Sequence, residues 1–300
     1  MSEFNQLVVN GLALGSIYAL IALGYTMVYG ILRLINFAHG EIFMVGTFVG
    51  LFTARALGID ADPTLAGFLV VLLAAMAAAA LMGFVIERLA YRPLRNAPRL
   101  NLLITAVGIS LLLQNLMQVI FGATPRVFPE IMPQTALVDS PTLSLTNQQA
   151  AVLLVSLGLM VGLEWVIMHT KLGRAMRAVS HSHETASLVG IPVDRVIAFT
   201  FMLGSALAAA AGILVGVCYP RVDPMMGMMP GIKAFVAAVL GGIGSVRGAV
   251  AGALIMGVAE SLVVGWGAST FRDALAFAIL ILILLLRPAG LFGRYEPEKV

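Results

Sequence analysis

The chain has 300 residues, of which 60% are hydrophobic and 11% are charged, and its formal net charge is +3. A soluble domain has about 25% charged and about 45–50% apolar residues, so this composition excludes an ordinary soluble fold and favours packed membrane helices. The small positive charge does not indicate nucleic-acid binding, and the single cysteine, Cys218, cannot form an internal disulfide. We therefore expect an all-α fold, a polytopic transmembrane helix bundle formed by one domain over residues 1–300.

The first long hydrophobic segment, residues 7–30, follows a start without Lys or Arg, so it is predicted to be a retained helix and not a signal peptide. A crossing needs about 20 apolar residues. Reading 234–265 as one broken helix, or 31–54 as partly re-entrant, would lower the count below nine. About eight or nine membrane helices are therefore expected, some of them broken. The candidate segments in chain order are 7–30, 34–54, 64–86, 100–121, 149–168, 196–219, 234–246, 248–265 and 271–286.

The basic residues fall unequally on the two sides of a nine-crossing bundle. Thirteen of the 18 lie in one set of alternate connections, which the positive-inside rule places in the cytoplasm. Nine crossings therefore put the N-terminus outside and the C-terminus in the cytoplasm. The first group is Arg33, Arg88, Arg92, Arg95, Arg99, Lys171, Arg174, Arg177, Arg195, Arg247, Arg287, Arg294 and Lys299; the second is Arg55, Arg126, Arg221, Lys233 and Arg272.

Two connections are long. Residues 122–148 are expected to form an external loop or a short surface helix, and residues 169–195 a cytoplasmic loop. In the latter, Ser182 is suited to cap a helix of about two turns that ends at Gly190 in the C′ position. So short a helix is not stable alone and must pack on something. An ordinary basic loop on an anionic membrane face is the alternative.

Polar residues inside the hydrophobic segments mark candidate pathway positions, because ionisable groups at membrane depth are costly. Asn36, His39 and Glu41 are predicted either to line a pathway at a helix break or to form a cluster at the membrane interface, within reach of water. Gln114 is expected to form inter-helix hydrogen bonds or to contact the substrate. Glu260 is expected to be paired with an arginine or a backbone group, or to belong to the pathway.

Four stretches resemble the permease subunits of ABC importers for branched-chain, hydrophobic amino acids. GYTMVYGILRLINFAHGE at 24–41 resembles the signature of that family's second helix, and KLGRAMRAVSHSHETASLVGIPVDR at 171–195 its coupling segment. KAFVAAVLGGIGSVRGAVAGALIMGVAE at 233–260 and LRPAGLFG at 286–293 resemble its late Gly-rich block and its C-terminal end. Their order along nearly the whole chain strengthens the resemblance.

The resemblance implies a chain that forms half of a translocation pathway in the bacterial inner membrane. Its implied partners are two cytoplasmic ABC ATPases, a second permease subunit that is related but different, a periplasmic solute-binding protein and membrane lipid. This chain would bind no cofactor or metal, and ATP and Mg²⁺ would be used by the ATPases. The positions implied to couple it to an ATPase are Gly173, Arg174, Arg177, Glu184, Ala186, Gly190 and Ile191.

The sequence lacks the phosphate-binding motif G-x-x-x-x-G-K-[ST], so an ATP-driven role requires another chain. The alternative function is a secondary transporter driven by an ion gradient, with Glu41, Glu164 and Glu260 as proton carriers. A membrane-embedded enzyme is disfavoured, because His39 and Glu41 lack the H-E-x-x-H spacing of a zinc peptidase. The sequence does not distinguish aliphatic amino acids from urea, amides or aromatic acids as the solute.

Overall fold

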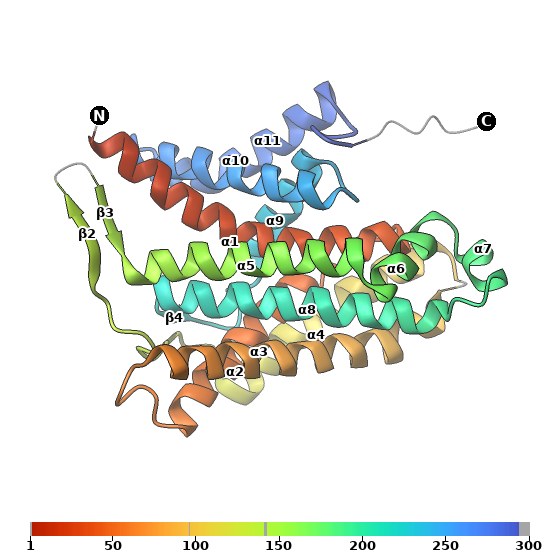
Figure 1. Cartoon of the computed structure of the whole chain (residues 1–300), viewed down its shortest axis with the longest axis horizontal. Helices are drawn as coiled ribbons and strands as arrows, with labels where there is room; N and C mark the ends of the chain where they lie inside the picture. Colours follow the sequence, from red (N-terminus) through yellow and green to blue (C-terminus); the bar gives the residue numbers. More distant parts are fainter. Residues whose placement is uncertain (1, 96, 141–142, 294–300) are drawn as a thin grey trace.

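A computed structural model describes residues 2–95, 97–140 and 143–293 of the chain (Figure 1). It is mostly helical, as predicted, and its long helices run roughly along one axis of the molecule. The helices are α1 (Ser2–Leu32), α2 (His39–Ala56), α3 (Leu65–Ile86), η1 (Glu87–Tyr91), η2 (Arg92–Leu94), α4 (Arg99–Phe121), α5 (Asn147–His169), α6 (Lys171–His181), α7 (His183–Leu188), α8 (Val193–Cys218), α9 (Met228–Gly241), α10 (Val246–Gly265), η3 (Ser269–Phe271) and α11 (Arg272–Leu286); the strands are β1 (Arg126–Val127), β2 (Ala136–Ser140), β3 (Leu143–Thr146) and β4 (Arg221–Val222).

Within the described residues, seven helical stretches are long and apolar enough to cross a membrane: α1, α3, α4, α5, α8, α10 and η3–α11. The other two predicted segments differ. Helix α9 has 14 residues and a length of about 21 Å, too short for a hydrocarbon core of about 30 Å. Helix α2 begins only at His39, after residues 33–38 that are not helical. The expectation of broken helices is confirmed. Of the nine predicted segments, seven correspond to helices long and apolar enough to cross a membrane, and α2 and α9 are the two that do not.

The two ends of the bundle carry different structures. One end, which we call the hairpin end, has the antiparallel β2–β3 hairpin and the N-terminus; the other, the α7 end, has α6 and α7 (Figure 1). The alternative of a short surface helix within 122–148 is wrong, because residues 136–140 and 143–146 form strands. Branched and small polar residues suit a pleated hairpin better than a helix. Short strands β1 and β4 pair at the hairpin end.

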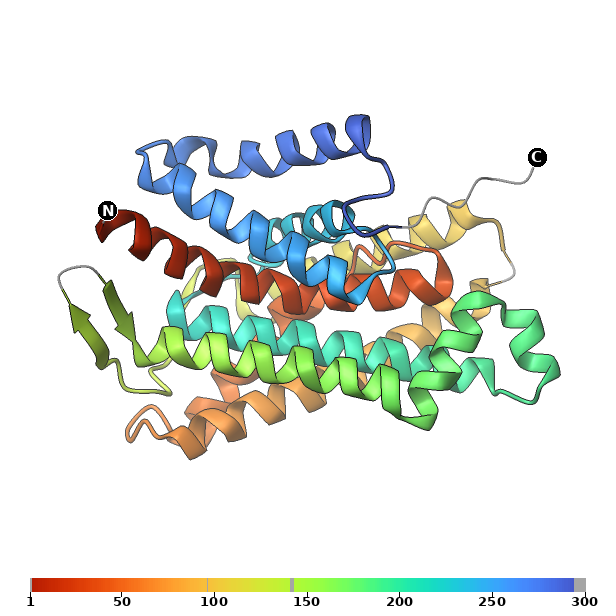
Figure 2. The same ribbon diagram turned by 45° about the horizontal axis from the view of Figure 1, so that its top comes forward.

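The core forms where small residues let helices approach closely. A Cβ on Gly46 of α2 would lie 2.6 Å from the Cα of Ala209 in the Ala-rich middle of α8. Gly15 of α1 similarly contacts Leu254 of α10. Small residues at these positions thus serve packing within the chain. Helices α1 and α8 are consequently central, and Figure 2 shows α10 and α11 as a pair on the outside of α1.

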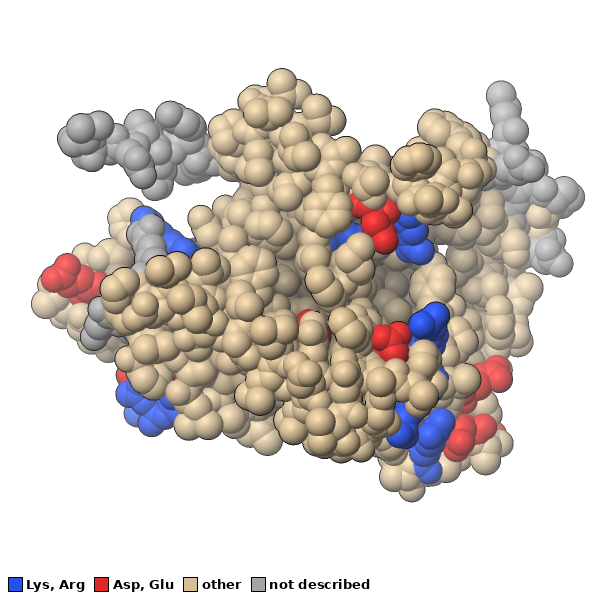
Figure 3. All heavy atoms as spheres, turned by 180° about the vertical axis from the view of Figure 1, so that it is seen from behind, with Lys and Arg blue, Asp and Glu red and all other residues tan. Residues whose placement is uncertain are grey.

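The outer faces are apolar. Leu285 and Leu286 of α11 and Val119 of α4 are at least 75% exposed. Figure 3 shows one face of the molecule with a broad band nearly free of charge, while most charged side chains gather toward the two ends. This distribution is that of a protein whose middle faces lipid or another membrane chain.

Candidate functional site

The non-helical segment 33–38 separates α1 from α2 and is held by side chains. Arg33 ends α1 with a φ of +52°, a left-handed conformation that is uncommon for a residue other than glycine. The Oδ1 atom of Asn36 accepts hydrogen bonds from the Tyr91 hydroxyl at 2.7 Å and from the Ala38 N–H at 3.2 Å. Asn36 therefore fixes the turn from which α2 begins.

Helices α2 and α9 meet N-terminus to N-terminus inside the bundle. A Cβ on Gly40 would lie 2.6 Å from the carbonyl oxygen of Gly227, so the two backbones are in direct contact. The His39 ring at the start of α2 packs against Gly24, which is eight residues before the end of α1, or about 12 Å from it. From this α2–α9 junction, α2 runs to the hairpin end, where Arg55 donates to the Val127 carbonyl at 3.3 Å, and α9 runs to the opposite end.

Glu41 lies in the first turn of α2 and is only 2% exposed. Its Oε1 atom accepts hydrogen bonds from Gln114 Nε2 at 2.7 Å and from the Ser110 hydroxyl at 3.3 Å, both on α4. Its Oε2 atom has no hydrogen-bond partner among the described residues, and neither has Nε2 of His39. Asn36, His39, Glu41 and Gln114 are therefore all buried, and Glu41 is bonded directly to Gln114; that they line a pathway stays a prediction.

Glu260 lies apart, in an ion-pair cluster of its own. Its carboxylate accepts from Lys233 Nζ at 2.8 Å, from the Tyr18 hydroxyl at 2.9 Å and from Arg272. Lys233 also pairs with Asp273 at 2.7 Å. The expected arginine pairing is confirmed, whereas Lys233 and Tyr18 were not predicted as partners. A partner for Lys233 could have been expected from the sequence, because Lys233 is the one charged residue in the otherwise apolar α9.

The predicted cytoplasmic loop begins with α6, which is clamped to the end of α5. Thr170 caps α6 by accepting from the Gly173 N–H at 3.0 Å. Gly173 lies so close to the carbonyl oxygens of Val166 and Ile167 that a Cβ would overlap both. Arg177 donates to the same Ile167 carbonyl. Among the residues implied for coupling, Gly173 and Arg177 therefore set the position of α6, while Arg174 is exposed.

Helix α7 has the ends that the sequence predicted. The Ser182 hydroxyl accepts from the Thr185 N–H at 3.2 Å, and Gly190 adopts a φ of +81°. Ala186 packs inward and its carbonyl accepts from the Ile191 N–H at 3.0 Å. Glu184 and Leu188 point outward, with Leu188 83% exposed. The result is a short helix, capped by Ser182 and ended by Gly190, that projects beyond the ends of α5 and α8 (Figure 2).

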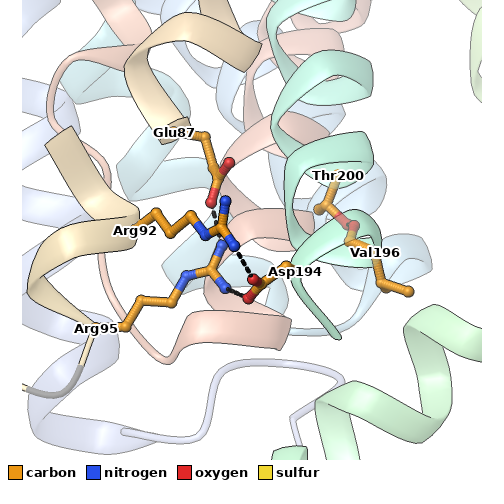
Figure 4. A network of polar contacts seen from close by, with 6 residues as sticks. All are labelled: Glu87, Arg92, Arg95, Asp194, Val196 and Thr200. Carbon is orange, nitrogen blue, oxygen red and sulfur yellow. Dashed lines mark hydrogen bonds and ion pairs between the residues drawn. The ribbon is translucent and has the colours of Figure 1, made fainter. Parts of the chain in front are cut away.

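A polar network fastens the beginning of α8, directly after this loop (Figure 4). Asp194 pairs with Arg92 and with Arg95, each at 2.5 Å. Arg95 also pairs with the buried Glu87 of η1. This contact between α8 and η1–η2 was not predicted, because the partners are about 100 residues apart and no local spacing signals it.

The family model described as "Branched-chain amino acid transport system / permease component" matches residues 7–284. The chain belongs to that permease family. It is 46% identical to the high-affinity branched-chain amino acid transport system permease protein LivH of Salmonella typhimurium, and equally to LivH of Escherichia coli, covering 99% of this chain and 98% of each relative. It is 42% identical to BraD of Pseudomonas aeruginosa, again covering 99% and 98%.

Among solved structures, PsaBC from Streptococcus pneumoniae in complex with Fab matches 98% of this chain and 92% of its own, at 15% identity and a TM-score of 0.44, which is too distant to support a functional inference. The family match and the seven long apolar helices of the described residues make this permease a multi-pass membrane protein of a transport system. Within the described residues, no group of three or more His, Cys, Asp or Glu side chains is placed to hold a metal ion.

Proposed function

We propose that this permease forms half of the translocation pathway of an ATP-driven importer for branched-chain or other hydrophobic amino acids. The observation that carries the proposal is the family match over residues 7–284, combined with an outward-pointing α7 that is held by Ser182 and Gly190 at its ends. A short helix held at both ends transmits a displacement that a flexible loop would absorb. The substrate class is taken from the names of LivH and BraD, which are permease proteins of high-affinity branched-chain amino acid transport systems.

The proposed machine needs further chains. Two ABC ATPases would bind ATP and Mg²⁺ and would each receive a short helix such as α7, while a periplasmic solute-binding protein would deliver the amino acid. A second, related permease subunit would supply the other half of the pathway. It would cover part of the exposed apolar face formed by residues such as Val119 of α4, and lipid would cover the rest.

Docking on the ATPase is assigned to the exposed side of the coupling segment, which includes Arg174, Glu184 and Leu188. The residues that hold this surface in place are Gly173 and Arg177 against α5, and Ala186, Gly190 and Ile191 within and after α7. The implied coupling positions thus divide into a contact set and a supporting set.

The orientation follows from charge. The chain reaches the α7 end after α1, α3, α5, α9 and α11. The segments that follow these helices carry the larger group of basic residues. The positive-inside rule makes the α7 end cytoplasmic in the inner membrane, with the N-terminus outside. Arg294 and Lys299, counted in that group, lie outside the described residues.

The ion-coupled transporter is the competing function, and two of its three glutamates are occupied. Glu260 is neutralised by Lys233 and Arg272, and Glu164 pairs with Arg247 at 2.8 Å. Neither is a free proton carrier in this arrangement. Such a transporter would also leave the exposed α7 without a role.

The test is to purify the tagged permease from gently solubilised native membranes and identify what accompanies it by mass spectrometry. Two ATPases with phosphate-binding loops and a second permease would support the importer. Recovery of the permease alone, active in ion-driven uptake, would favour the ion-coupled alternative.

A further inference from the structure

The N-termini of α2 and α9 differ from those of the other long helices. Both are buried, since the residues before the first turns are Ala38 and Gly227, and neither has a side-chain cap. Helices α3, α5, α6 and α10 are capped by Thr or Ser hydroxyls, and the other uncapped starts, of α4, α8 and α11, follow exposed residues. The partial positive charge of α9 is thus inside the bundle, with no acidic residue in its own first turn.

A second observation at the same place is the free oxygen of Glu41. Oε2 is directed at the junction, 3.1 Å from the position that a Cβ on Gly227 would take, and has no hydrogen-bond partner among the described residues. A buried carboxylate oxygen without a partner is costly, so this geometry points to a cation or donor that pairs with it at another stage.

A third observation concerns what surrounds the junction. Met225, which precedes α9, and Met228 and Met229 in its first turn flank Gly227 and are 36–50% exposed; we call these three residues the methionine patch. Methionine side chains are flexible and adapt to apolar groups of different shape. The patch therefore offers an apolar surface beside a negative oxygen and a positive helix end.

We propose that the α2–α9 junction binds the amino acid in transit as a zwitterion. Its ammonium group would pair with Glu41 Oε2, its carboxylate would lie at the N-terminus of α9, and its aliphatic side chain would rest on the methionine patch. Discontinuous membrane helices use their N-termini for anionic substrate groups in this way. The proposal rests on the proposed function for its substrate class and adds the site within this chain.

The junction is closed in the present conformation. The contact between Gly40 and Gly227 and the burial of Glu41 leave no room for a ligand. Binding therefore requires the two N-termini to separate, so the site would form in an open conformation and be lost in the closed one. A site that opens and closes in this way is suited to brief occupation and low affinity during transport.

The first test uses the complete transporter, with its partner subunits and binding protein, in proteoliposomes. Glu41→Gln keeps an acceptor for Gln114 and Ser110 but replaces the free oxygen with an amide donor. ATP-driven uptake of L-leucine should fall by about tenfold or more, since a hydrogen bond between charged groups contributes that much. ATP hydrolysis stimulated by the loaded binding protein should stay within about twofold, and Glu164→Gln should transport normally.

The second test does not depend on how Glu41→Gln assembles. In a Cys218→Ser background, Met228→Cys should react with a methanethiosulfonate reagent in the purified complex, and millimolar L-leucine should slow this labelling. The analogues 4-methylpentanoate, which lacks the ammonium group, and isoamylamine, which lacks the carboxylate, should protect less. Leu188→Cys, exposed on α7, is the control that leucine should not protect.

Three outcomes would overturn the site: wild-type uptake by Glu41→Gln, equal labelling of Met228→Cys with and without leucine, or a Met228→Cys that is unreactive because another subunit covers it. Each can occur while the wild-type transporter imports leucine with ATP, in which case the proposed function stands. Absence of ATP-driven leucine uptake by the wild type would instead contradict the proposed function.

Discussion

Nε2 of His183 lies 2.7 Å from the carbonyl oxygen of Ile31, which connects α7 to the last turn of α1. The last carbonyls of a helix have no partner within it, so this contact satisfies one of them. From Ile31 the chain runs through 33–38 directly into the α2–α9 junction. We therefore expect a displacement of α7 to act, through one hydrogen bond, on the segment that leads to the buried Glu41.

Replacing His183 should weaken transport more than stability. His183→Ala removes one hydrogen bond, which costs about 1 kcal/mol, so the complex should still assemble. We expect fewer leucine molecules imported per ATP hydrolysed, measured in proteoliposomes with both quantities followed together. His181→Ala, on an exposed histidine two residues earlier, is the matched control. An unchanged ratio in His183→Ala would show that α7 does not act through α1.

Gly173 should tolerate no side chain. In Gly173→Ala the new methyl group overlaps the carbonyl oxygens of Val166 and Ile167, so α6 must move away from α5 at a cost of about 1–3 kcal/mol. ATPase co-purification and coupled uptake should both fall while the protein still reaches the membrane, and Gly173→Asp should be more severe. Gly162→Ala on α5, where a Cβ meets nothing within 4 Å, is the control. Equal uptake by the two alanine variants would refute the clamp.

Charge reversal on the exposed side of α7 tests docking separately from folding. Glu184→Lys leaves the α7 cap at Ser182 intact, because Glu184 is exposed and its side chain is not needed for that bond. The variant permease should unfold at the wild-type temperature, yet its uptake should be uncoupled from ATP hydrolysis. Normal uptake in both Glu184→Lys and Gly173→Asp would remove the assignment of residues 171–195 as the coupling segment.

The ion pairs of Glu260 should be structural. Lys233 is 4% exposed, and breaking a buried pair by removing one partner costs about 3–5 kcal/mol. Lys233→Met should therefore lower the unfolding temperature in detergent by several degrees. Arg247→Met breaks the exposed pair with Glu164, worth about 0–1 kcal/mol, and should shift it little. Similar shifts in the two variants would mean that the cluster does not hold α9.

The contact between Gly40 and Gly227 should limit opening and closing of the junction. Gly40→Ala introduces a methyl group 2.6 Å from the Gly227 carbonyl oxygen and prevents the observed closure. Uptake should drop although the complex assembles, and Gly108→Ala, where a Cβ meets nothing within 4 Å, should have no effect. A Gly40→Ala transporter that works at the wild-type rate would show that this closure is not part of the cycle.

Local signals predicted α7 well. The Ser182 cap and the C′ position of Gly190 defined α7 because both act within a few residues. The hydrophobic runs gave seven crossings for the same reason. Helix α9 was predicted as a crossing because its apolar residues continue beyond Gly241, although the chain there turns with a φ of +103° at Gly242.

Contacts between distant residues were the part that the sequence did not reveal. The pairing of Glu41 with Gln114 joins residues 73 apart, and that of Tyr18 with Glu260 joins residues 242 apart. No spacing rule reaches so far. Polar residues in apolar segments indicated that partners exist, but only the packing of α2 against α4 and of α1 against α10 decides which ones.

Leucine uptake into proteoliposomes that contain the complete transporter, with and without ATP and with an ionophore, tests the central proposal most directly. The proposal predicts uptake that requires ATP and the solute-binding protein and that is unchanged when the ionophore collapses the ion gradients. Uptake by this chain alone, driven by an ion gradient and indifferent to ATP, would contradict it.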